Sequence, residues 1–374
     1  MSAPTFAIIA GGGTGGHVVP AIAVGRALVE LGHDPSSIRF VGSARGVEGR
    51  LVPAAGFRLT TLPGRGLVRR WDLPSAARNA RSATGLAAAV ARAVVLVRRL
   101  RPAVVVSVGG WASFACAAAA AAWRVPVVVM EQNAVPGAAN RLAARAAAAC
   151  AVSFPGTALP RAVVTGNPVR PEVVAVDRTP GGRARAREAL GLPAAGTVVA
   201  VAGGSLGARR VNEAALDLAG RWSGCDGVAV RHVIGERDWP LLSGRLPAAG
   251  RLAYQAVPFE DHMERLYAAA DVFVGRAGAS TVAELAAVGL GSVLVPLPGA
   301  PGDHQTANAR RMEEAGAAVV VADADCDGPT LDATLAPLLA DAGRRQAMDA
   351  AARRLGRPDA ARRVARLVEA HARG

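Results

Sequence analysis

Two glycine-rich segments, one in each half of the chain, constrain its fold more than any other feature. The first is IIAGGGTGGH at residues 8–17, and the second is VVAVAGGSLG at residues 198–207. Each begins as an apolar run typical of a buried strand and leads into a helical pattern. Glycines at such a junction leave backbone N–H groups accessible, and the dipole of the following helix favours phosphate there. The sequence therefore predicts two phosphate sites, which suggests a diphosphate donor and a phosphorylated acceptor that meet across a cleft.

The chain has 374 residues, more than the roughly 250–300 that one hydrophobic core supports. Apolar runs alternate with helical patterns, which predicts an α/β fold with two doubly wound parallel sheets. The expected strands are 6–10, 38–41, 104–108, 125–130, 198–202, 228–234, 272–274 and 293–296. Prolines interrupt the pattern at 165–171, so we expect domains at 1–164 and 165–374, the second ending in a helical tail.

The absence of lysine excludes two classes of phosphate-binding enzyme. All 43 basic residues are arginine, so the chain has neither the GK[ST] of a nucleotide hydrolase nor the Schiff-base lysine of pyridoxal phosphate enzymes. Gly11, Gly13 and Gly16 match the dinucleotide fingerprint GxGxxG, but residues 42–45 are Gly-Ser-Ala-Arg, where that class has an acidic residue for the ribose. The first glycine loop then binds a phosphate that belongs to neither a dinucleotide nor pyridoxal phosphate. Alternatively, its glycines only form a tight strand-to-helix turn.

No metal ion and no organic cofactor is expected. The cysteines, Cys116, Cys150, Cys225 and Cys326, have no metal or redox spacing and are few for a secreted chain. Residues 323–328, DADCDG, open like an EF-hand loop but have Thr334 where the bidentate glutamate belongs, so we interpret them as a surface turn. Phosphate charge must then be met by backbone N–H groups and by arginines such as Arg170 and Arg276.

The formal charge of +14 is typical of chains with anionic partners, and arginine and alanine enrichment can also reflect coding bias. Nucleic acid is not expected, because aromatic residues make up only 4% of the chain and do not alternate with arginines. From Arg65 to Arg101 arginines mix with apolar residues, which indicates either a surface that rests on anionic lipid or an ordinary solvated helix. The N-terminus lacks a signal-peptide pattern, and no run is typical of a transmembrane helix.

Polar residues follow several expected strands, at the edge where open α/β sheets bind ligands. His17 begins a helix whose dipole favours a neutral imidazole, which can accept a hydroxyl proton; alternatively the ring only holds the loop by a hydrogen bond. Glu284, one turn into a helix, is placed to take two ribose hydroxyls, but Thr281 and Glu284 also fit the T-x-x-E capping box. Residues 304–309, HQTANA, offer amide groups to a sugar.

Six motifs stand in a fixed order along the chain. They are GGTGGH at 12–17, EQN at 131–133, GNPVR at 166–170, GGSLGAR at 203–209, RAGASTVAE at 276–284 and HQTANA at 304–309. In this order they closely resemble the MurG family, the N-acetylglucosaminyltransferases of glycosyltransferase family 28, from the first strand to about residue 310. The resemblance implies a GT-B fold, in which two Rossmann-like domains face a cleft. It also implies that the C-terminal domain holds UDP-N-acetylglucosamine and that the N-terminal, membrane-facing domain holds the lipid acceptor.

The resemblance assigns residues to the donor. Ser205 and its loop would bind the diphosphate, Glu284 the ribose, and Gln305 with Asn133 the hydroxyls of N-acetylglucosamine. The nucleotide pocket would be completed by Arg170, Arg276, Ala279, Ser280, Thr281, Val282 and Ala283. Glu260 departs from the family, which usually has an apolar residue there whose backbone contacts uracil. The backbone contact can survive this change, but a packing role of the side chain is in question.

On the first domain, the resemblance places a second set of residues near the sugar and the acceptor diphosphate. Those lining the cleft would be Thr14, Gly15 and Gly16, and those on the acceptor side would be Gly13, His17 and Asn140.

The implied reaction moves N-acetylglucosamine from UDP-N-acetylglucosamine to the 4-hydroxyl of MurNAc in undecaprenyl-diphosphate-MurNAc-pentapeptide. This step converts lipid I to lipid II in peptidoglycan synthesis, with inversion and without metal. His17 is the candidate general base, and the second glycine loop, its helix dipole and Arg276 would stabilise the departing UDP. The protein would be peripheral at the cytoplasmic face of the plasma membrane, its basic face on anionic lipid. The alternatives are a UDP-N-acetylglucosamine 2-epimerase and a non-catalytic nucleotide-sugar-binding protein.

Overall fold

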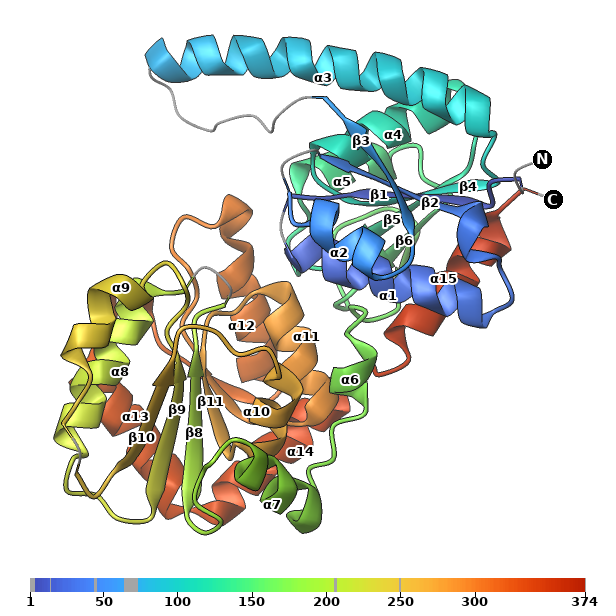
Figure 1. Cartoon of the computed structure of the whole chain (residues 1–374). Helices are drawn as coiled ribbons and strands as arrows, with labels where there is room; N and C mark the ends of the chain where they lie inside the picture. The colour runs from blue at the N-terminus through green and yellow to red at the C-terminus, as the bar shows by residue number, and fades with distance from the viewer. Residues whose placement is uncertain are drawn as a thin grey trace. The chain divides into compact units, whose positions relative to one another are not determined.

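The structure is a computed structural model of the chain, and it forms two compact units (Figure 1). It describes residues 4–13, 15–43, 46–63, 73–204, 207–248 and 250–373, apart from the side chains of residues 73–83. The first unit consists of residues Met1–Arg170 and Pro358–Gly374, and the second of residues Pro171–Arg357.

The first unit is built on a parallel sheet. Within the described residues its strands are β1 (Ala7–Gly11), β2 (Ile38–Ser43), β3 (Arg58–Leu62), β4 (Val104–Gly109), β5 (Val127–Glu131), β6 (Ala149–Val152) and β7 (Ala162–Val164). They are ordered β3-β2-β1-β4-β5-β6-β7. The connections therefore change direction between β1 and β4, which pair in parallel with Ile9 opposite Val106. In doubly wound folds this change of direction marks the ligand-binding edge.

Helices cover both faces of this sheet (Figure 1). They are α1 (Gly15–Glu30), α2 (Glu48–Ala54), α3 (Leu73–Leu100), α4 (Trp111–Ala122), α5 (Ala138–Ala144) and α15 (Ala360–His371). Because side chains alternate along a strand, Ile8 and Ala10 pack with α3, α4 and α5, whereas Ala7 and Ile9 pack with α1 and α15. The central strands β1 and β4 are thus buried on both faces, as their continuous apolar runs indicate.

The C-terminal helix belongs to a different unit from the one that the expected domain division gives it. The sequence places the tail with residues 165–374, but α15 belongs to the first unit, and the division otherwise falls after Arg170. Val364, Ala365 and Val368 are fully buried against the face of the sheet that α1 covers. The apolar stripe of this helix packs on a core that includes the first strand and the first helix of the chain. Such a contact between distant segments cannot be predicted from a local sequence pattern.

The second unit repeats the same architecture. Within the described residues its strands are β8 (Thr197–Ala202), β9 (Val228–Val233), β10 (Ala253–Val257), β11 (Val272–Gly275), β12 (Ser292–Leu294) and β13 (Ala318–Val320). Their order is β10-β9-β8-β11-β12-β13, all parallel, so the change of direction lies between β8 and β11. The α/β, doubly wound fold predicted from the sequence is confirmed in both units.

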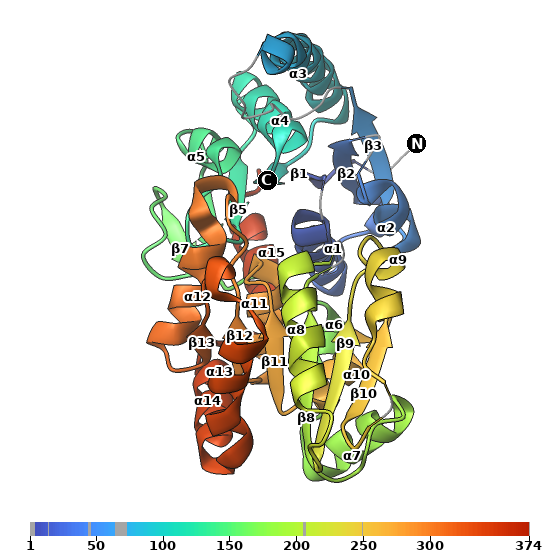
Figure 2. The ribbon, with the colours of Figure 1, turned by 90° about the vertical axis from the view of Figure 1, so that its left-hand side faces the viewer.

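The helices of the second unit again cover two faces (Figure 1, Figure 2). They are α6 (Pro171–Val174), α7 (Pro180–Ala189), α8 (Arg209–Arg221), α9 (Trp239–Leu242), α10 (Met263–Ala269), α11 (Ala279–Val288), α12 (His304–Glu314), α13 (Gly328–Ala340) and α14 (Ala342–Leu355). Side chains of α8 and α13 join the core on one face, and side chains of α7 and α10 join the core on the other. In the part of the chain that the structure describes, no helix has the length and apolar character needed to cross a membrane.

Candidate active site

The carboxyl ends of β1 and β4 form the candidate site of the first unit. β1 ends at Gly11 and α1 begins at Gly15, so His17 lies in the first turn of α1. Its imidazole packs against the end of β4, since a Cβ atom at Gly109, the last residue of that strand, would lie 2.9 Å from His17 Nε2. Gly109 has a φ of +120°, which disfavours any other residue there. The structure therefore places His17 where the sheet changes direction.

The other residues predicted on this loop lie beside His17. Gly13 is exposed with a φ of +96°, and Gly15 and Gly16 are the first two residues of α1. Thr14 lies outside the described residues. The first turn of a helix has N–H groups without intrahelical partners, so this turn can hold an anion.

An acidic residue does follow β2, although not at the position that a dinucleotide fold requires. Glu48 begins α2 and is 1% exposed, with its carboxylate turned inward against Gly13 and Ser43. The carboxylate of this residue is thus used within the protein, by donors of the first glycine loop and of the end of β2.

The loop after β5 is organised by one carboxylate. Glu131 ends β5 and is 2% exposed. Its Oε1 accepts from the backbone N–H and the Nδ2 of Asn133, at 3.0 and 3.2 Å, and its Oε2 accepts from Asn140 Nδ2 at 2.9 Å. Asn140 is 2% exposed and also donates to the carbonyl of Met130. Two predicted site residues are thus brought together, but Asn140 is directed into the protein, where it supports the loop.

The second glycine loop joins β8 to α8 at the switch point of the second unit. Gly204 and Gly207 have φ values of +89° and +74°. A Cβ atom at Gly207 would lie 2.7 Å from the carbonyl oxygen of Ile234 and 2.9 Å from Asp238 Oδ2, so only glycine fits. Ser205, the predicted diphosphate ligand, lies outside the described residues.

The capping-box interpretation of Glu284 is wrong. α11 begins at Ala279 and its N-cap is Gly278, which leaves Thr281 inside the helix, and no side chain caps it. Glu284 lies in the second turn, is 8% exposed, and accepts a hydrogen bond from the Tyr267 hydroxyl at 2.8 Å. The first turn, which contains the predicted pocket residues Ala279, Ser280, Thr281, Val282 and Ala283, lies at the carboxyl end of β11. This edge of the sheet is where a nucleotide is expected.

Arg276 is committed to contacts within the protein that the sequence did not predict. Its Nη1 donates to the carbonyls of Val295 and Pro296 at 3.1 and 3.2 Å and to Asp323 Oδ1 at 2.5 Å. Residues 323–328 were expected to be a surface turn, and Asp325 and Asp327 are exposed there, but Asp323 serves this ion pair. The guanidinium thus links the end of β11 to the loop after β12.

Gln305 lies in the first turn of α12, where its Oε1 accepts from the backbone N–H of Leu297 at 3.0 Å. This bond fixes the amide so that its Nε2 group is the part left to donate. Arg170 is half-buried at the last residue of the first unit. Among the described residues, no three His, Cys, Asp or Glu side chains gather in a way that holds a metal ion.

Glu260, the departure from the family pattern, forms an ion pair in place of an apolar contact. It follows β10 and is 9% exposed. Its Oε2 accepts from Arg231 Nη2 at 2.8 Å, and its Oε1 accepts from the backbone N–H of His262 at 3.2 Å. Arg231 Nη1 also donates to Gln255 Oε1 at 3.0 Å. The side chain is therefore held on the sheet, and a basic residue on β9 compensates the acidic one.

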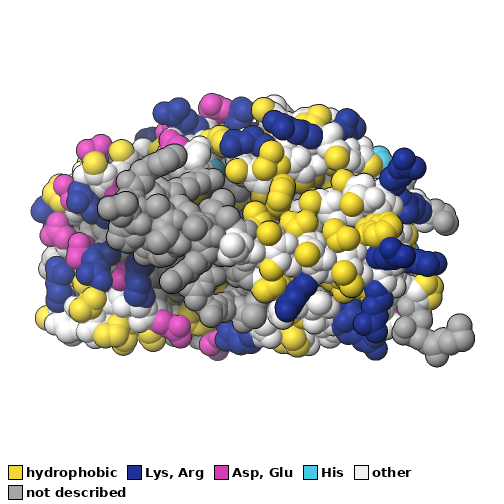
Figure 3. Space-filling view, turned by 90° about the horizontal axis from the view of Figure 1, so that it is seen from above, with side chains coloured by type: hydrophobic (Ala, Val, Ile, Leu, Met, Phe, Trp, Pro, Cys, Tyr) yellow, Lys and Arg dark blue, Asp and Glu magenta, His cyan; other side chains and the backbone are white. Residues whose placement is uncertain are grey.

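The outer surface at α3, called the α3 face below, has many apolar side chains with arginines around them (Figure 3). Val95 is 67% exposed there, and the Arg98 guanidinium lies 5.0 Å from the ring centroid of Trp123. Of the arginine-rich segment from Arg65 to Arg101, residues 65–72 and the side chains of residues 73–83 lie outside the described residues.

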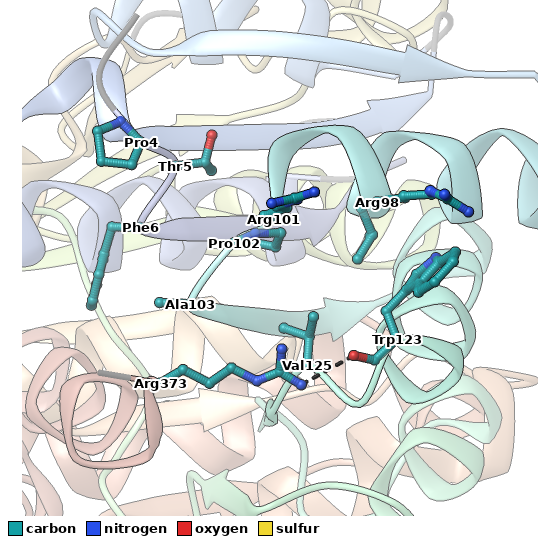
Figure 4. A pocket seen from close by; sticks show the side chains of 11 residues that line it. Pro4, Thr5, Phe6, Arg98, Arg101, Pro102, Ala103, Trp123, Val125 and Arg373 are labelled. Carbon is teal, nitrogen blue, oxygen red and sulfur yellow. Dashed lines mark hydrogen bonds between the residues drawn. The ribbon is translucent and has the colours of Figure 1, made fainter.

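A cavity of about 640 Å³ lies at the end of α3, by the amino ends of β1 and β4 (Figure 4). Arg98, Arg101 and Arg373 line it, and none of its described lining residues is acidic. Arg373 donates to the carbonyl of Trp123 at 3.1 Å. This basic cavity lies at the opposite edge of the sheet from His17.

Family models match both units. The N-terminal domain of glycosyltransferase family 28 matches residues 7–152, and its C-terminal domain matches residues 198–364. The chain is 41% identical over 374 residues to the UDP-N-acetylglucosamine--N-acetylmuramyl-(pentapeptide) pyrophosphoryl-undecaprenol N-acetylglucosamine transferase of Moorella thermoacetica, covering 96% of this chain and 97% of that one. The protein of the same name from a Nocardioides species is 42% identical over 365 residues, with 96% of each chain covered.

Solved structures agree with this grouping. The crystal structure of Acinetobacter baumannii MurG has a TM-score of 0.76 at 27% identity and covers 98% of this chain and 100% of its own. The UDP-GlcNAc 2-epimerase of Neisseria meningitidis, solved with UDP-GlcNAc, has a TM-score of 0.65 at 13% identity, over 98% of this chain and 100% of that one. At that identity the second likeness shows the fold alone. With a GT-B pair of doubly wound units and both family models matched, the chain belongs to glycosyltransferase family 28.

Proposed function

We propose that this protein transfers N-acetylglucosamine from UDP-N-acetylglucosamine to the 4-hydroxyl of MurNAc in undecaprenyl-diphosphate-MurNAc-pentapeptide, which makes lipid II for peptidoglycan. The observation that carries the proposal is the similarity to transferases of this name at 41% identity over 96% of the chain. Both glycine loops fall within the matched family models, and each lies at the switch point of its own sheet. One phosphate site per unit suits a reaction that joins a nucleotide diphosphate to a lipid diphosphate.

The second unit is proposed to hold the donor. The N–H groups that begin α8 and α11, with the Ser205 loop, would bind the diphosphate, and the buried Glu284 carboxylate would take the ribose hydroxyls. Gln305 Nε2 is free to donate to the sugar, because Leu297 fixes only the Oε1 side. Arg276 Nη1 is already used by Asp323, so the helix N-termini carry most of the stabilisation of departing UDP. Arg170 would complete the pocket.

The proposed chemistry is a single displacement with inversion. The acceptor oxygen forms a bond to the anomeric carbon while the bond to the UDP oxygen breaks, and its electron pair leaves with UDP. The hydroxyl proton passes to His17, whose ring lies at the switch point of the first unit. Gly13 would lie on the acceptor side, and Asn140 would support that side through the loop after β5. Thr14, Gly15 and Gly16 would line the cleft, and Asn133 would contact the hydroxyls of N-acetylglucosamine. Since backbone N–H groups meet the diphosphate charge, the proposal requires no metal ion.

The epimerase is the less favoured alternative. Its likeness is limited to the fold, at 13% identity, whereas the Moorella thermoacetica and Nocardioides transferases are 41% and 42% identical over nearly the whole chain. An epimerase also acts without an acceptor, so it would not need the EQN segment at residues 131–133.

A transfer assay tests the proposal. Purified protein receives radiolabelled UDP-N-acetylglucosamine with and without a lipid I analogue, in the presence of a chelator. Label that enters the lipid only when the acceptor is present is the expected result. Isomerised sugar nucleotide without acceptor would establish the epimerase instead, and UDP binding with no product would leave only a binding protein.

We further propose that the protein is peripheral to the cytoplasmic face of the plasma membrane. The arginines of the α3 face and of the basic cavity would meet anionic headgroups, while exposed apolar residues such as Val95 would enter the interface. Vesicles of phosphatidylglycerol should bind the protein, and vesicles of phosphatidylcholine should bind it weakly. Equal binding to both would count against a role for the arginines.

A further inference from the structure

A buried carboxylate lies beneath the first glycine loop and has no part in the mechanism above. Glu48, the first residue of α2, is 1% exposed. Its Oε1 accepts from the backbone N–H of Ser43 at 2.7 Å and from Ser43 Oγ at 2.8 Å. Its Oε2 accepts from the backbone N–H of Gly13 at 3.1 Å. One side chain thus ties the end of β2 to the loop after β1.

Three glycines make room for this carboxylate. A Cβ atom at Gly12 or Gly46 would overlap it, and a Cβ atom at Gly42 would lie 2.7 Å from Glu48 Cγ. Gly13 is different, because open space surrounds the position of its Cβ and its φ is +96°. Part of the glycine pattern that suggests a phosphate loop is therefore required by Glu48 and not by a ligand.

Glu48 is charged at neutral pH. Burial raises the pKa of this carboxyl, but hydrogen bonds from the backbone N–H groups of Glu48, Ser43 and Gly13 lower it more, so the net pKa lies below its usual range. An ionised acceptor binds backbone N–H groups more strongly than a neutral one. Within the described residues, no arginine or histidine forms an ion pair with it.

The peptide unit between Gly12 and Gly13, whose N–H binds Glu48, is also held on its carbonyl side. The carbonyl oxygen of Gly12 faces Gly110, where a Cβ atom would lie 3.3 Å away, and Gly12 O and Gly13 N belong to one planar peptide unit. Glu48 and the loop after β4 therefore fix this peptide between them. The preceding residue, Gly109, ends β4 and packs against the His17 ring. The carboxylate thus lies at one end of a packed series of groups that ends at His17.

We propose that Glu48 is a positioning residue for the acceptor side of the reaction. It turns the Gly13 N–H inward and fixes the loop, so that the N–H groups of the first turn of α1 face the acceptor diphosphate and His17 faces the acceptor hydroxyl. The inference rests on the proposed function in naming the acceptor, but the hydrogen bonds that carry it belong to the chain itself.

The variant Glu48→Gln tests this inference. The amide keeps the size of the side chain, but its NH2 group meets the N–H of Gly13 or of Ser43, so one hydrogen bond becomes a repulsion between donors. A loop misplaced by about 1 Å lowers turnover about 100-fold. We expect a loss of that order in kcat/KM for the lipid I analogue, with KM for UDP-N-acetylglucosamine and the calorimetric affinity for UDP unchanged.

Two further variants separate positioning from general damage. Ser43→Ala removes only the hydroxyl contact and should shift the same acceptor parameter by less. Glu30→Gln, on the exposed side of α1 where the carboxylate is 61% exposed, is the matched control and should behave as wild type. An equal loss of donor affinity in Glu48→Gln, or wild-type kcat/KM for the acceptor, would overturn the inference.

Direct binding distinguishes this inference from the proposed function. Affinity for the lipid I analogue is measured with UDP present, so that no turnover is needed. If the wild type binds the analogue but transfers no sugar, the proposed reaction fails, while weaker binding by Glu48→Gln still supports the positioning role. If the wild type binds no analogue at all, both are refuted.

Discussion

Replacing Glu260 by leucine should destabilise the second unit, because it removes one partner of a largely buried ion pair. The side chains of Arg231 and Glu260 are 14% and 7% exposed, and their charged atoms are 2.8 Å apart. Loss of one partner of such a pair costs about 3–5 kcal/mol. We expect a loss at the lower end of this range, about 3 kcal/mol, because Arg231 keeps its hydrogen bond to Gln255 Oε1. For a unit of this size that corresponds to a fall in Tm of about 6–12 °C.

The double variant Arg231→Leu/Glu260→Leu provides the decisive comparison. With both charges removed, apolar side chains fill the same space and most of the stability should return, since such replacements are often neutral. Thermal unfolding of the wild type, both single variants and the double variant gives the coupling free energy, expected at about 2–3 kcal/mol. Additive losses in the double variant would refute this reasoning.

The same four proteins test uracil recognition. If only the backbone at residue 260 contacts the base, the double variant should bind UDP with an affinity within about twofold of wild type, which is less than 0.5 kcal/mol. A matched control is Asp226→Leu, which breaks the pair between Arg251 and Asp226, whose side chains are 68% and 60% exposed. That exposed pair should contribute less than about 1 kcal/mol.

Three further predictions concern single side chains. His17→Ala should lower kcat by about 100- to 10,000-fold with little change in donor KM, and nearly normal turnover would exclude His17 as the base. Burial lowers the pKa of His232 to about 3, so below its unfolded value of about 6.5 only the unfolded chain takes up this proton. The free energy of unfolding is therefore unaffected by protonation of this histidine above pH 6.5. As the pH falls from 6.5 towards 3, protonation of the unfolded chain lowers the free energy of unfolding by up to about 1.4 kcal/mol per pH unit. His232→Asn should therefore reduce proton uptake on unfolding at pH 5 by about one proton, and unchanged uptake would contradict this. Burial raises the pKa of the Cys116 thiol to about 12 and those of Cys150 and Cys326 to about 11. A maleimide at pH 7.5 should then label only Cys225 in the folded protein, and mass spectrometry that finds label on Cys116 would contradict the burial.

The sheets could be predicted from the sequence because buried parallel strands have continuous apolar runs. Residues 104–108 and 198–202 are such runs, and both are central strands. Two of the strands that the pattern did not identify lack this signal, whereas β6, a short buried run that follows an alanine-rich helix, was missed despite it. β7 has three exposed residues at the sheet edge, and every residue of β10 is half-buried, so neither contrasts with its surroundings.

The contacts of the candidate site were harder to predict, because they join distant residues. Arg276 and Asp323 are 47 positions apart, and nothing in either motif identifies the other as its partner. Thr281 and Glu284 match a capping box in spacing, but the helix starts earlier, at Ala279, and this start depends on where β11 ends. Local patterns therefore identified which residues lie at the sheet edges and not what those residues contact.

The two glycine loops are alike in sequence, but the buried charges beneath them differ. Asp238 lies under the second loop, fully buried, and is paired with Arg209 and Arg237. Burial raises the pKa of Asp238, but hydrogen bonds from Arg237 and Arg209 lower it more, so this site has one negative and two positive charges. Glu48 lies under the first loop with backbone and hydroxyl donors only, among the residues described. The charge near the second loop therefore favours a diphosphate, whereas at the first loop the N–H groups of α1 must overcome a buried negative charge. Glycine spacing alone cannot reveal this difference, since it depends on which side chains lie beneath each loop.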